Sequence, residues 1–171
     1  MREKFTDDQW AAIRSAPEWI GAAVASVGKS GVMGTLKEDG SIRVLIKEKG
    51  EKYPRNPIIQ PILLELGLRS PKMKISIDEQ HWELRQRYKS GQVGHDDVLP
   101  DFALEILNES VGLITESADP RDVVEYKRWV LEMGQAVAEV AKEGGFLGIG
   151  GERVSQAESD FLERVRAVLK V

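Results

Sequence analysis

Apolar residues recur at helical spacing in the last third of the chain. The stripe consists of Val123, Tyr126, Val130, Met133, Val137 and Val140. Steps of three and four residues place these side chains on one face of a helix. Asp119 followed by Pro120 is typical of a capped helix start, and Gly144 with Gly145 is typical of a helix end. The pattern therefore predicts a long helix between these signals.

A further helix is expected after the glycine-rich segment. Ser155 is a suitable N-cap, and Glu158 follows three residues later, which is the spacing of a capping box. The apolar face of this helix consists of Phe161, Val165, Val168 and Leu169. We expect it to dock on the rest of the fold as a C-terminal element.

The first part of the chain predicts two consecutive helices. Thr6 can cap a short helix that runs through Ile13, and Ser15 or Ala16 with Pro17 opens the next one. Because proline lacks the N–H that continues a helix, we place a boundary at this point.

The middle of the chain predicts more helices and leaves two strand alternatives. The expected helices cover residues 35–49, 56–66 with Asn56 as the cap, 78–88, and Pro100 to about Glu116. Residues 41–46 are rich in β-branched side chains, and residues 72–77 alternate polar with apolar, as a half-buried strand does. We favour helix for 41–46, while 72–77 stays open between helix and strand.

Two segments of the chain resemble each other. Residues 20–31 and 133–144 are identical at seven of twelve aligned positions, including Gly21 with Gly134 and Val24 with Val137. After one inserted residue, both copies continue with two apolar residues and a glycine. This similarity predicts a duplicated helix–loop–helix unit.

Together these patterns predict an all-α fold, a mostly antiparallel bundle of about seven or eight helices with a pseudo-twofold internal repeat. We expect a single domain over residues 1–171. The repeat halves cover roughly residues 5–50 and 119–171, and residues 51–118 form a helical insert.

Composition narrows the function classes. The chain has no cysteine, which excludes a disulfide framework, a thiolate nucleophile and cysteine-ligated metal centres. A net charge of −4 disfavours a nucleic-acid binder, although residues 36–91 carry a surplus of 4 positive charges (12 Lys+Arg, 8 Asp+Glu). Neither a secretory h-region nor an apolar run of the ~20 residues needed to span a bilayer is present. We expect a cytoplasmic protein without a membrane span.

The glycine-rich segment is the most distinctive candidate for ligand binding. Its candidate residues are Gly144, Gly145, Gly148, Gly150, Gly151 and the following Ser155. Glycines allow backbone amides to turn inward, and a following helix N-terminus favours anions. A Walker loop is excluded because the chain reads Gly-Gly-Glu at its end, and a dinucleotide loop needs a preceding strand. A structural turn that buries its apolar residues is the alternative interpretation.

The stretch from residue 141 to 162 resembles the helix–turn–helix of tellurite-resistance TerB-like helical proteins. Glu143, Gly144, Ser155 and Glu158 match the family outline of an acidic, glycine-bearing turn, a small hydroxyl residue and a glutamate three positions on. The resemblance covers about an eighth of the chain, and residues 146–153 form an insertion relative to the shorter family turn. It implies a helical fold and an acidic metal site, for which Glu143 and Glu158 are the candidates.

Other polar groups have simpler explanations. His95 with Asp96 and Asp97 has the chemistry of a cation site, but one of these carboxylates capping the following helix is the simpler interpretation. His81 is expected to be an exposed polar residue. The four tryptophans, Trp10, Trp19, Trp82 and Trp129, are expected to pack in the core.

No catalytic residue or cofactor motif follows from the sequence. Our first functional hypothesis is a non-enzymatic helical binding or assembly module, for which a homo-oligomer, in particular a homodimer, is one form. The alternative is a TerB-like metal- or anion-binding stress-response protein.

Overall fold

The computed structural model describes residues 1–28, 41–68, 95–143 and 155–171. Within these residues the chain forms a 3₁₀ turn, η1 (Arg2–Lys4), and six α-helices, and no strand is present among them. The helices are α1 (Asp7–Val27), α3 (Ser41–Gly50), α4 (Ile59–Leu68), α6 (His95–Ser117), α7 (Pro120–Glu143) and α8 (Gln156–Leu169). The prediction of an all-α fold is confirmed.

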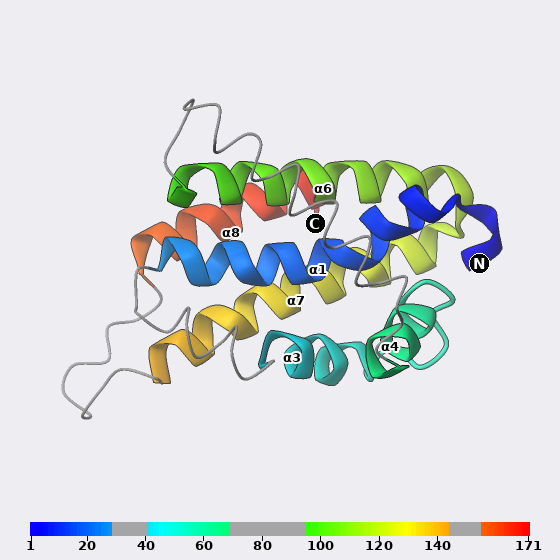
Figure 1. The fold of residues 1–171 in the computed structure, drawn as a ribbon, viewed down its shortest axis with the longest axis horizontal. Coiled ribbons are helices and arrows are strands. Elements are labelled where there is room, and N and C mark those ends of the chain that lie inside the picture. Colours follow the sequence, from blue (N-terminus) through cyan, green and yellow to red (C-terminus); the bar gives the residue numbers. More distant parts are fainter. Residues whose placement is uncertain (29–40, 69–94, 144–154) are drawn as a thin grey trace.

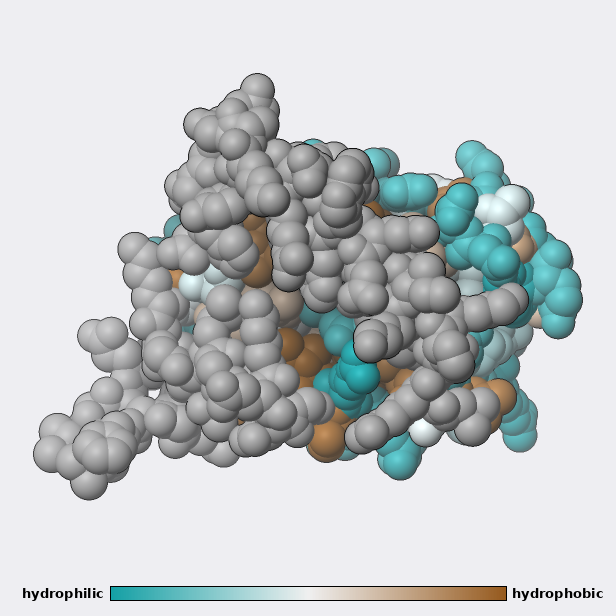
Figure 2. All heavy atoms as spheres, viewed as in Figure 1, coloured by the Kyte–Doolittle hydropathy of each residue, from teal (hydrophilic) through white to brown (hydrophobic). Residues whose placement is uncertain are grey.

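The helices form a bundle with α1 in the middle (Figure 1). α6 runs antiparallel to α1, whereas α7 crosses α1 in the same general direction. α8 packs against α1, α6 and α7, and α3 packs against α1 and α7. α4 follows α3, packs against it, and lies near the end of the molecule where the amino terminus is found. The coloured surface at the amino-terminal end is mainly hydrophilic (Figure 2), where η1 and the first turn of α1 expose polar residues.

The helix starts follow the caps that the sequence predicts. At α1, the side chain of Thr6 accepts a hydrogen bond from the Gln9 amide at 3.3 Å, and the Gln9 side chain accepts one from the Thr6 amide at 3.0 Å. At α7, the Asp119 carboxylate accepts from the Arg121 amide at 2.9 Å, and Pro120 is the first helical residue. These bonds satisfy amides that have no partner inside the helix.

Asn56 caps α4 and also fixes it to α7. Its Oδ1 accepts from the amides of Ile58 and Ile59 at 2.9 and 3.0 Å. Its Nδ2 donates to the Asp122 carbonyl at 3.0 Å and to the Glu125 carboxylate at 2.9 Å. Asn56 is 1% exposed, so a residue predicted only as a cap is also a buried link between two helices.

The prediction of two separate helices around Pro17 is wrong, because α1 is continuous through this residue. Proline at position 17 removes the amide that would bond to the carbonyl of Ile13. The hydroxyl of Tyr126, on α7, donates to this carbonyl at 2.6 Å. A side chain from another helix therefore supplies the hydrogen bond that the proline cannot make.

Residues 41–46 are helical, as favoured over a strand. Ile42, Leu45 and Ile46 are buried, which is the i, i+3, i+4 spacing of a helix face, while Val44 is 61% exposed. The expected helical residues 35–40, the open segment 72–77 and the expected helix 78–88 lie outside the described residues.

α6 begins five residues earlier than Pro100. Asp96 and Asp97 are therefore inside its first turn, and the interpretation of either one as its N-cap is wrong. Pro100 is tolerated because the single hydrogen bond that it removes is the one to residue 96, at the beginning of the helix.

The core is formed by large side chains from α1, α6 and α7. Trp129, Tyr126 and Phe102 are almost completely buried, and Trp19 meets Phe102 edge-on with ring centroids 5.0 Å apart. The indole of Trp129 donates to the carbonyl of Ile46 at 3.1 Å, which connects α7 to α3. Three of the four tryptophans are buried, as predicted; Trp82 lies outside the described residues.

Candidate functional site

The glycine-rich segment of the sequence lies between the end of α7 and the start of α8. Its glycines lie outside the described residues, namely Gly144, Gly145, Gly148, Gly150 and Gly151. Glu143 is the last residue of α7, and its side chain is also outside the described part. Ser155 and Glu158, at the start of α8, are described completely.

Ser155 and Glu158 form the predicted capping box. The amide of Glu158 donates to Ser155 Oγ at 3.3 Å. In return, Glu158 Oε2 accepts from the Ser155 amide at 2.8 Å and from Ser155 Oγ at 2.7 Å. A carboxylate at this position also interacts favourably with the positive end of the helix dipole. The pair therefore has a structural role, and it places a negative charge where the sequence suggested that an anion could bind.

The other carboxylate oxygen of Glu158 faces the end of α1. Glu158 is 4% exposed, and its Oε1 has no hydrogen-bond partner in the described part of the chain. A Cβ atom at Gly28, the C-cap of α1, would lie 2.5 Å from this oxygen. Since real Cβ atoms do not approach so closely, any other residue at position 28 would displace the carboxylate of Glu158. The sequence gives no sign of this role of Gly28, because it arises from packing between distant segments.

Glu158 also occupies a core-facing position of α8. Leu162, Val165 and Leu169 follow it at steps of four, three and four residues, and all are buried. The first position of this buried stripe therefore carries a carboxylate instead of an apolar side chain. Burying a carboxylate costs free energy unless its oxygens accept hydrogen bonds, and only Oε2 of Glu158 does so among the described residues.

The contact between Gly28 and Glu158 joins the end of α1 to the start of α8. Residues 29–40 continue from Gly28, and residues 144–154 lead into α8. The carboxyl ends of α1 and α7 and the start of α8 all lie on the left side of Figure 1. The two glycine-bearing connections are thus attached to the same end of the bundle.

Gly21 and Gly134, which the repeat aligns, lie at the crossing of α1 and α7. A Cβ at Gly21 would lie 3.2 Å from Met133 Sδ and 3.5 Å from the side chain of Val137. A Cβ at Gly134 would lie 3.3 Å from the side chain of Ile20, and 3.8 Å from that of Val24. Each glycine allows the other helix to approach closely.

The same two glycines also face the next helix that the structure describes after their own. A Cβ at Gly21 would lie 2.9 Å from Ile42 Cγ2 on α3, and a Cβ at Gly134 would lie 3.2 Å from Leu162 Cδ2 on α8. α1 and α7 therefore have matching surroundings at these positions.

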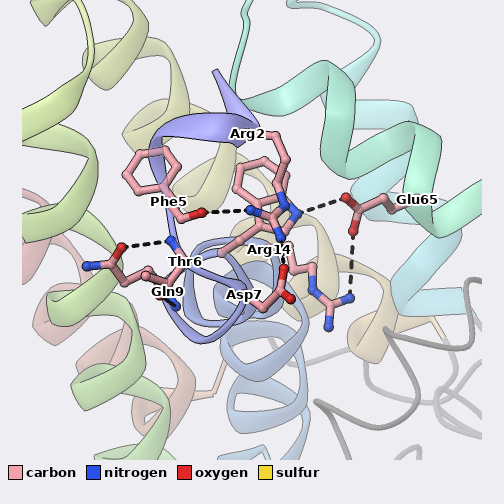
Figure 3. A network of polar contacts seen from close by, with 8 residues as sticks. Arg2, Phe5, Thr6, Asp7, Gln9, Arg14 and Glu65 are labelled. Atoms are coloured by element: carbon pink, nitrogen blue, oxygen red, sulfur yellow. Dashed lines mark hydrogen bonds and ion pairs between the residues drawn. The ribbon is translucent and has the colours of Figure 1, made fainter.

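A polar network joins α1 to α4 at the amino-terminal end (Figure 3). The Trp10 indole donates to Glu65 Oε1 at 2.8 Å, and Arg14 Nη1 lies 3.8 Å from Glu65 Oε2. Arg14 is 8% exposed, and burial lowers the pKa of its guanidinium, an effect that the nearby Glu65 carboxylate opposes. The guanidinium of Arg2 stacks over the Trp10 ring at 5.5 Å and pairs with Asp7.

A second polar cluster joins the segment after α3 to α7. The hydroxyl of Tyr53 donates to Glu132 Oε1 at 3.1 Å, and Lys52 Nζ lies 2.8 Å from Glu132 Oε2. Partial burial, together with the negative charge of Glu132, raises the pKa of Tyr53 to about 12. Neither network follows from local sequence patterns, because the partners are far apart in the chain.

The histidine and aspartate candidates fall outside the part of the chain whose side chains are described. His81 lies outside the described residues, as do the side chains of His95, Asp96 and Asp97. Within the described ranges, no three acidic or histidine side chains form a group that could hold a metal ion. Of the helices described, none has the length and apolar character needed to cross a membrane.

Comparisons with protein-family models, with curated proteins and with solved structures found no match for this chain.

Proposed function

We propose that this chain is a non-enzymatic helical binding or assembly module, a helical bundle in which two glycine-bearing connections begin at the carboxyl ends of α1 and α7. The contact between Gly28 and Glu158 carries this proposal, because it joins the start of one connection to the end of the other. Binding residues are often placed on loops that a rigid scaffold holds together.

An internal duplication accounts for this arrangement. The contacts of Gly21 and Gly134 pair Ile42 of α3 with Leu162 of α8. If the alignment of Ile42 with Leu162 is extended towards the N-terminus, Glu38 aligns with Glu158 and Thr35 with Ser155. Between the aligned glycines and these residues the second copy is longer by seven residues. One of them is the inserted residue noted above, and the other six are residues 149–154. We propose that the halves are two copies of one helix–loop–helix unit related by a pseudo-twofold axis.

Three polar side chains in the core have structural roles, which fits a module that binds through its surface. Tyr126 bonds to the Ile13 carbonyl, and Asn56 bonds to α4 and α7 with both ends of its amide. Ser110 lies 2.9 Å from the Tyr126 hydroxyl. These groups hold the fold together. We therefore propose that binding takes place at the surface, at the end of the bundle where α1 and α7 end and α8 begins.

Light scattering after size-exclusion chromatography tests the assembly form of this proposal. A homodimer would elute with twice the 19.1 kDa mass of one chain, and its fraction would rise with protein concentration. Val44 and Leu64 are 61% and 64% exposed, and the double variant Val44→Lys/Leu64→Lys shows whether α3 and α4 form the contact. A mass of 19.1 kDa at every concentration would remove the homodimer.

The second candidate is a TerB-like metal- or anion-binding stress-response protein. Glu158 favours it, because one oxygen of this buried carboxylate has no hydrogen-bond partner among the described residues. A cation suits this position better than an anion, since the carboxylate already lies at the N-terminus of α8. Glu143 is the second residue of the proposed acidic pair.

Thermal unfolding with divalent cations, phosphate and nucleotides tests the second candidate. A ligand that binds only the folded chain raises its melting temperature. Glu158→Gln should abolish the shift. Ser26→Ala is the matched control, because Ser26 is also buried, with no hydrogen-bond partner for its hydroxyl within the described ranges, but lies about 200° around α1 from Gly28. If no ligand raises the melting temperature of the unmodified chain, this candidate loses its support.

A further inference from the structure

Pro17 places a weak point in the middle of α1. Ten residues of the helix precede it and ten follow it within Asp7–Val27. A proline inside a helix removes one hydrogen bond, and its ring crowds the carbonyl four residues earlier, so helices bend or break at such positions. In this helix the affected carbonyl is that of Ile13.

Tyr126 compensates for this defect from the neighbouring helix. Its hydroxyl donates to the Ile13 carbonyl at 2.6 Å, and the tyrosine is completely buried. The Ser110 hydroxyl lies 2.9 Å from the tyrosine oxygen. Since the single hydroxyl hydrogen of Tyr126 points to Ile13, Ser110 donates to Tyr126, and a chain of hydrogen bonds connects α6, α7 and α1. Burial raises the pKa of Tyr126 above its ordinary value, so the hydroxyl keeps its hydrogen.

Both halves of α1 contact α7, at Ile13 and at Gly21, but they differ in their other partners. The first half is attached to α4, through the bond from Trp10 to Glu65. The second half holds Gly21 against α3 and α7, and ends at Gly28 beside Glu158. A change of angle at Pro17 would therefore move Gly28, at the carboxyl end of α1, relative to the first half of the helix.

We propose that Pro17 is a hinge in α1 and that Tyr126 is the latch that closes it. With the latch in place, the first half of α1 is fixed to α7 at Ile13, and both halves of the helix move together with α7. Without it, the first half of α1 opens independently of the second, which its contacts at Gly21 and Gly28 still hold. This proposal concerns the mechanics of the bundle, and it stands whether or not the chain is a binding module.

Hydrogen exchange measured by mass spectrometry on the full chain tests the latch. Tyr126→Phe should accelerate exchange of the amides in residues 10–16 by on the order of tenfold, because the carbonyl of Ile13 loses its buried donor and the first half of α1 loses its bond to α7. Amides in residues 21–27 should change much less, because the contacts at Gly21 and Gly28 remain. Tyr53→Phe is the matched control, because it removes a partly exposed hydroxyl that does not touch α1, and exchange in α1 should stay the same.

The variant Pro17→Ala/Tyr126→Phe separates a latch from a simple loss of packing. Alanine at position 17 has an amide that can bond to the Ile13 carbonyl, so exchange in residues 10–16 should return close to that of Pro17→Ala alone. Equal acceleration in both halves of α1, or no recovery in the double variant, would overturn the proposal. If Tyr126→Phe fails to fold, folding of the double variant supports the latch, and failure of both variants contradicts it.

Discussion

Alanine at Gly21 would place a methyl group in the crossing of α1 and α7. The new carbon would lie 2.9 Å from Ile42 Cγ2 and 3.2 Å from Met133 Sδ, both of which are buried. Added volume in a packed core typically costs about 1–3 kcal/mol. Replacing a helical glycine by alanine returns up to about 1 kcal/mol. We therefore expect Gly21→Ala to lower the free energy of unfolding by about 1 kcal/mol.

Two other glycines in helices provide matched comparisons. At Gly134 the nearest atoms belong to Leu162 and Ile20 at 3.2 and 3.3 Å, so the cost of a few tenths of an ångström of adjustment should roughly cancel the helical gain. At Gly112, exposed in α6, a Cβ would have no neighbour within 4 Å. There the full gain of about 0.5–1 kcal/mol should remain.

Urea denaturation followed by circular dichroism measures this ranking directly. The expected order of stability is Gly112→Ala above the unmodified chain, Gly134→Ala close to it, and Gly21→Ala below it. For a domain of this size, a difference of 1 kcal/mol moves the melting temperature by about 2–4 °C. If Gly21→Ala stabilises the chain as much as Gly112→Ala does, the close approach at the helix crossing is refuted.

Asn56→Ala should lower the free energy of unfolding by about 2 kcal/mol, because the α4 cap and the buried bonds to α7 disappear together, and urea denaturation measures the loss. Ser155→Ala should cost about 1 kcal/mol by the same assay, and Ser155→Thr should recover much of it, because threonine keeps the hydroxyl that caps the helix and donates to Glu158. Tyr53 should ionise near pH 12 instead of 10.0 when phenolate absorbance is followed against pH, and Glu132→Gln should lower this value. Because the folded chain holds this proton more tightly, the stability that Tyr53 contributes is complete below pH 10 and is lost as the pH rises towards 12; a rise in stability over this range would contradict the assignment.

The parts of the fold that the sequence predicts correctly depend on neighbours in the chain. The caps at Thr6, Asn56, Asp119 and Ser155 are bonds between residues two or three positions apart, so a short pattern contains both partners. Residues 41–46 were harder, because Ile42, Val44 and Ile46 also alternate as in a strand. Packing decides the matter: the bundle buries Leu45 and leaves Val44 exposed.

The incorrect and missed features depend on distant residues. The boundary placed at Pro17 followed from the local effect of proline, whereas the bond that keeps α1 continuous comes from Tyr126, 113 residues away from Ile13. The capping box of α8 was predicted, but the contact of Glu158 with Gly28 was not, since it requires α1 and α8 to be packed together. In both cases the local sequence pattern identifies one residue of the interaction but does not show which distant residue it contacts.

The residues that are unfavourable for a helix or a core lie in the same three helices, and their location indicates which contacts determine the fold. A proline inside a helix, glycines in helix interiors and a carboxylate in a buried stripe each cost free energy on their own. Here they occur in α1, α7 and α8, and each one fits a contact from another of these helices: Pro17 with Tyr126, Gly21 with Met133, and Gly28 with Glu158. A rearranged bundle would keep these costs and lose the matching contacts. We infer that the packing of α1 against α7 and α8 selects this fold among the bundles that the same apolar stripes would allow.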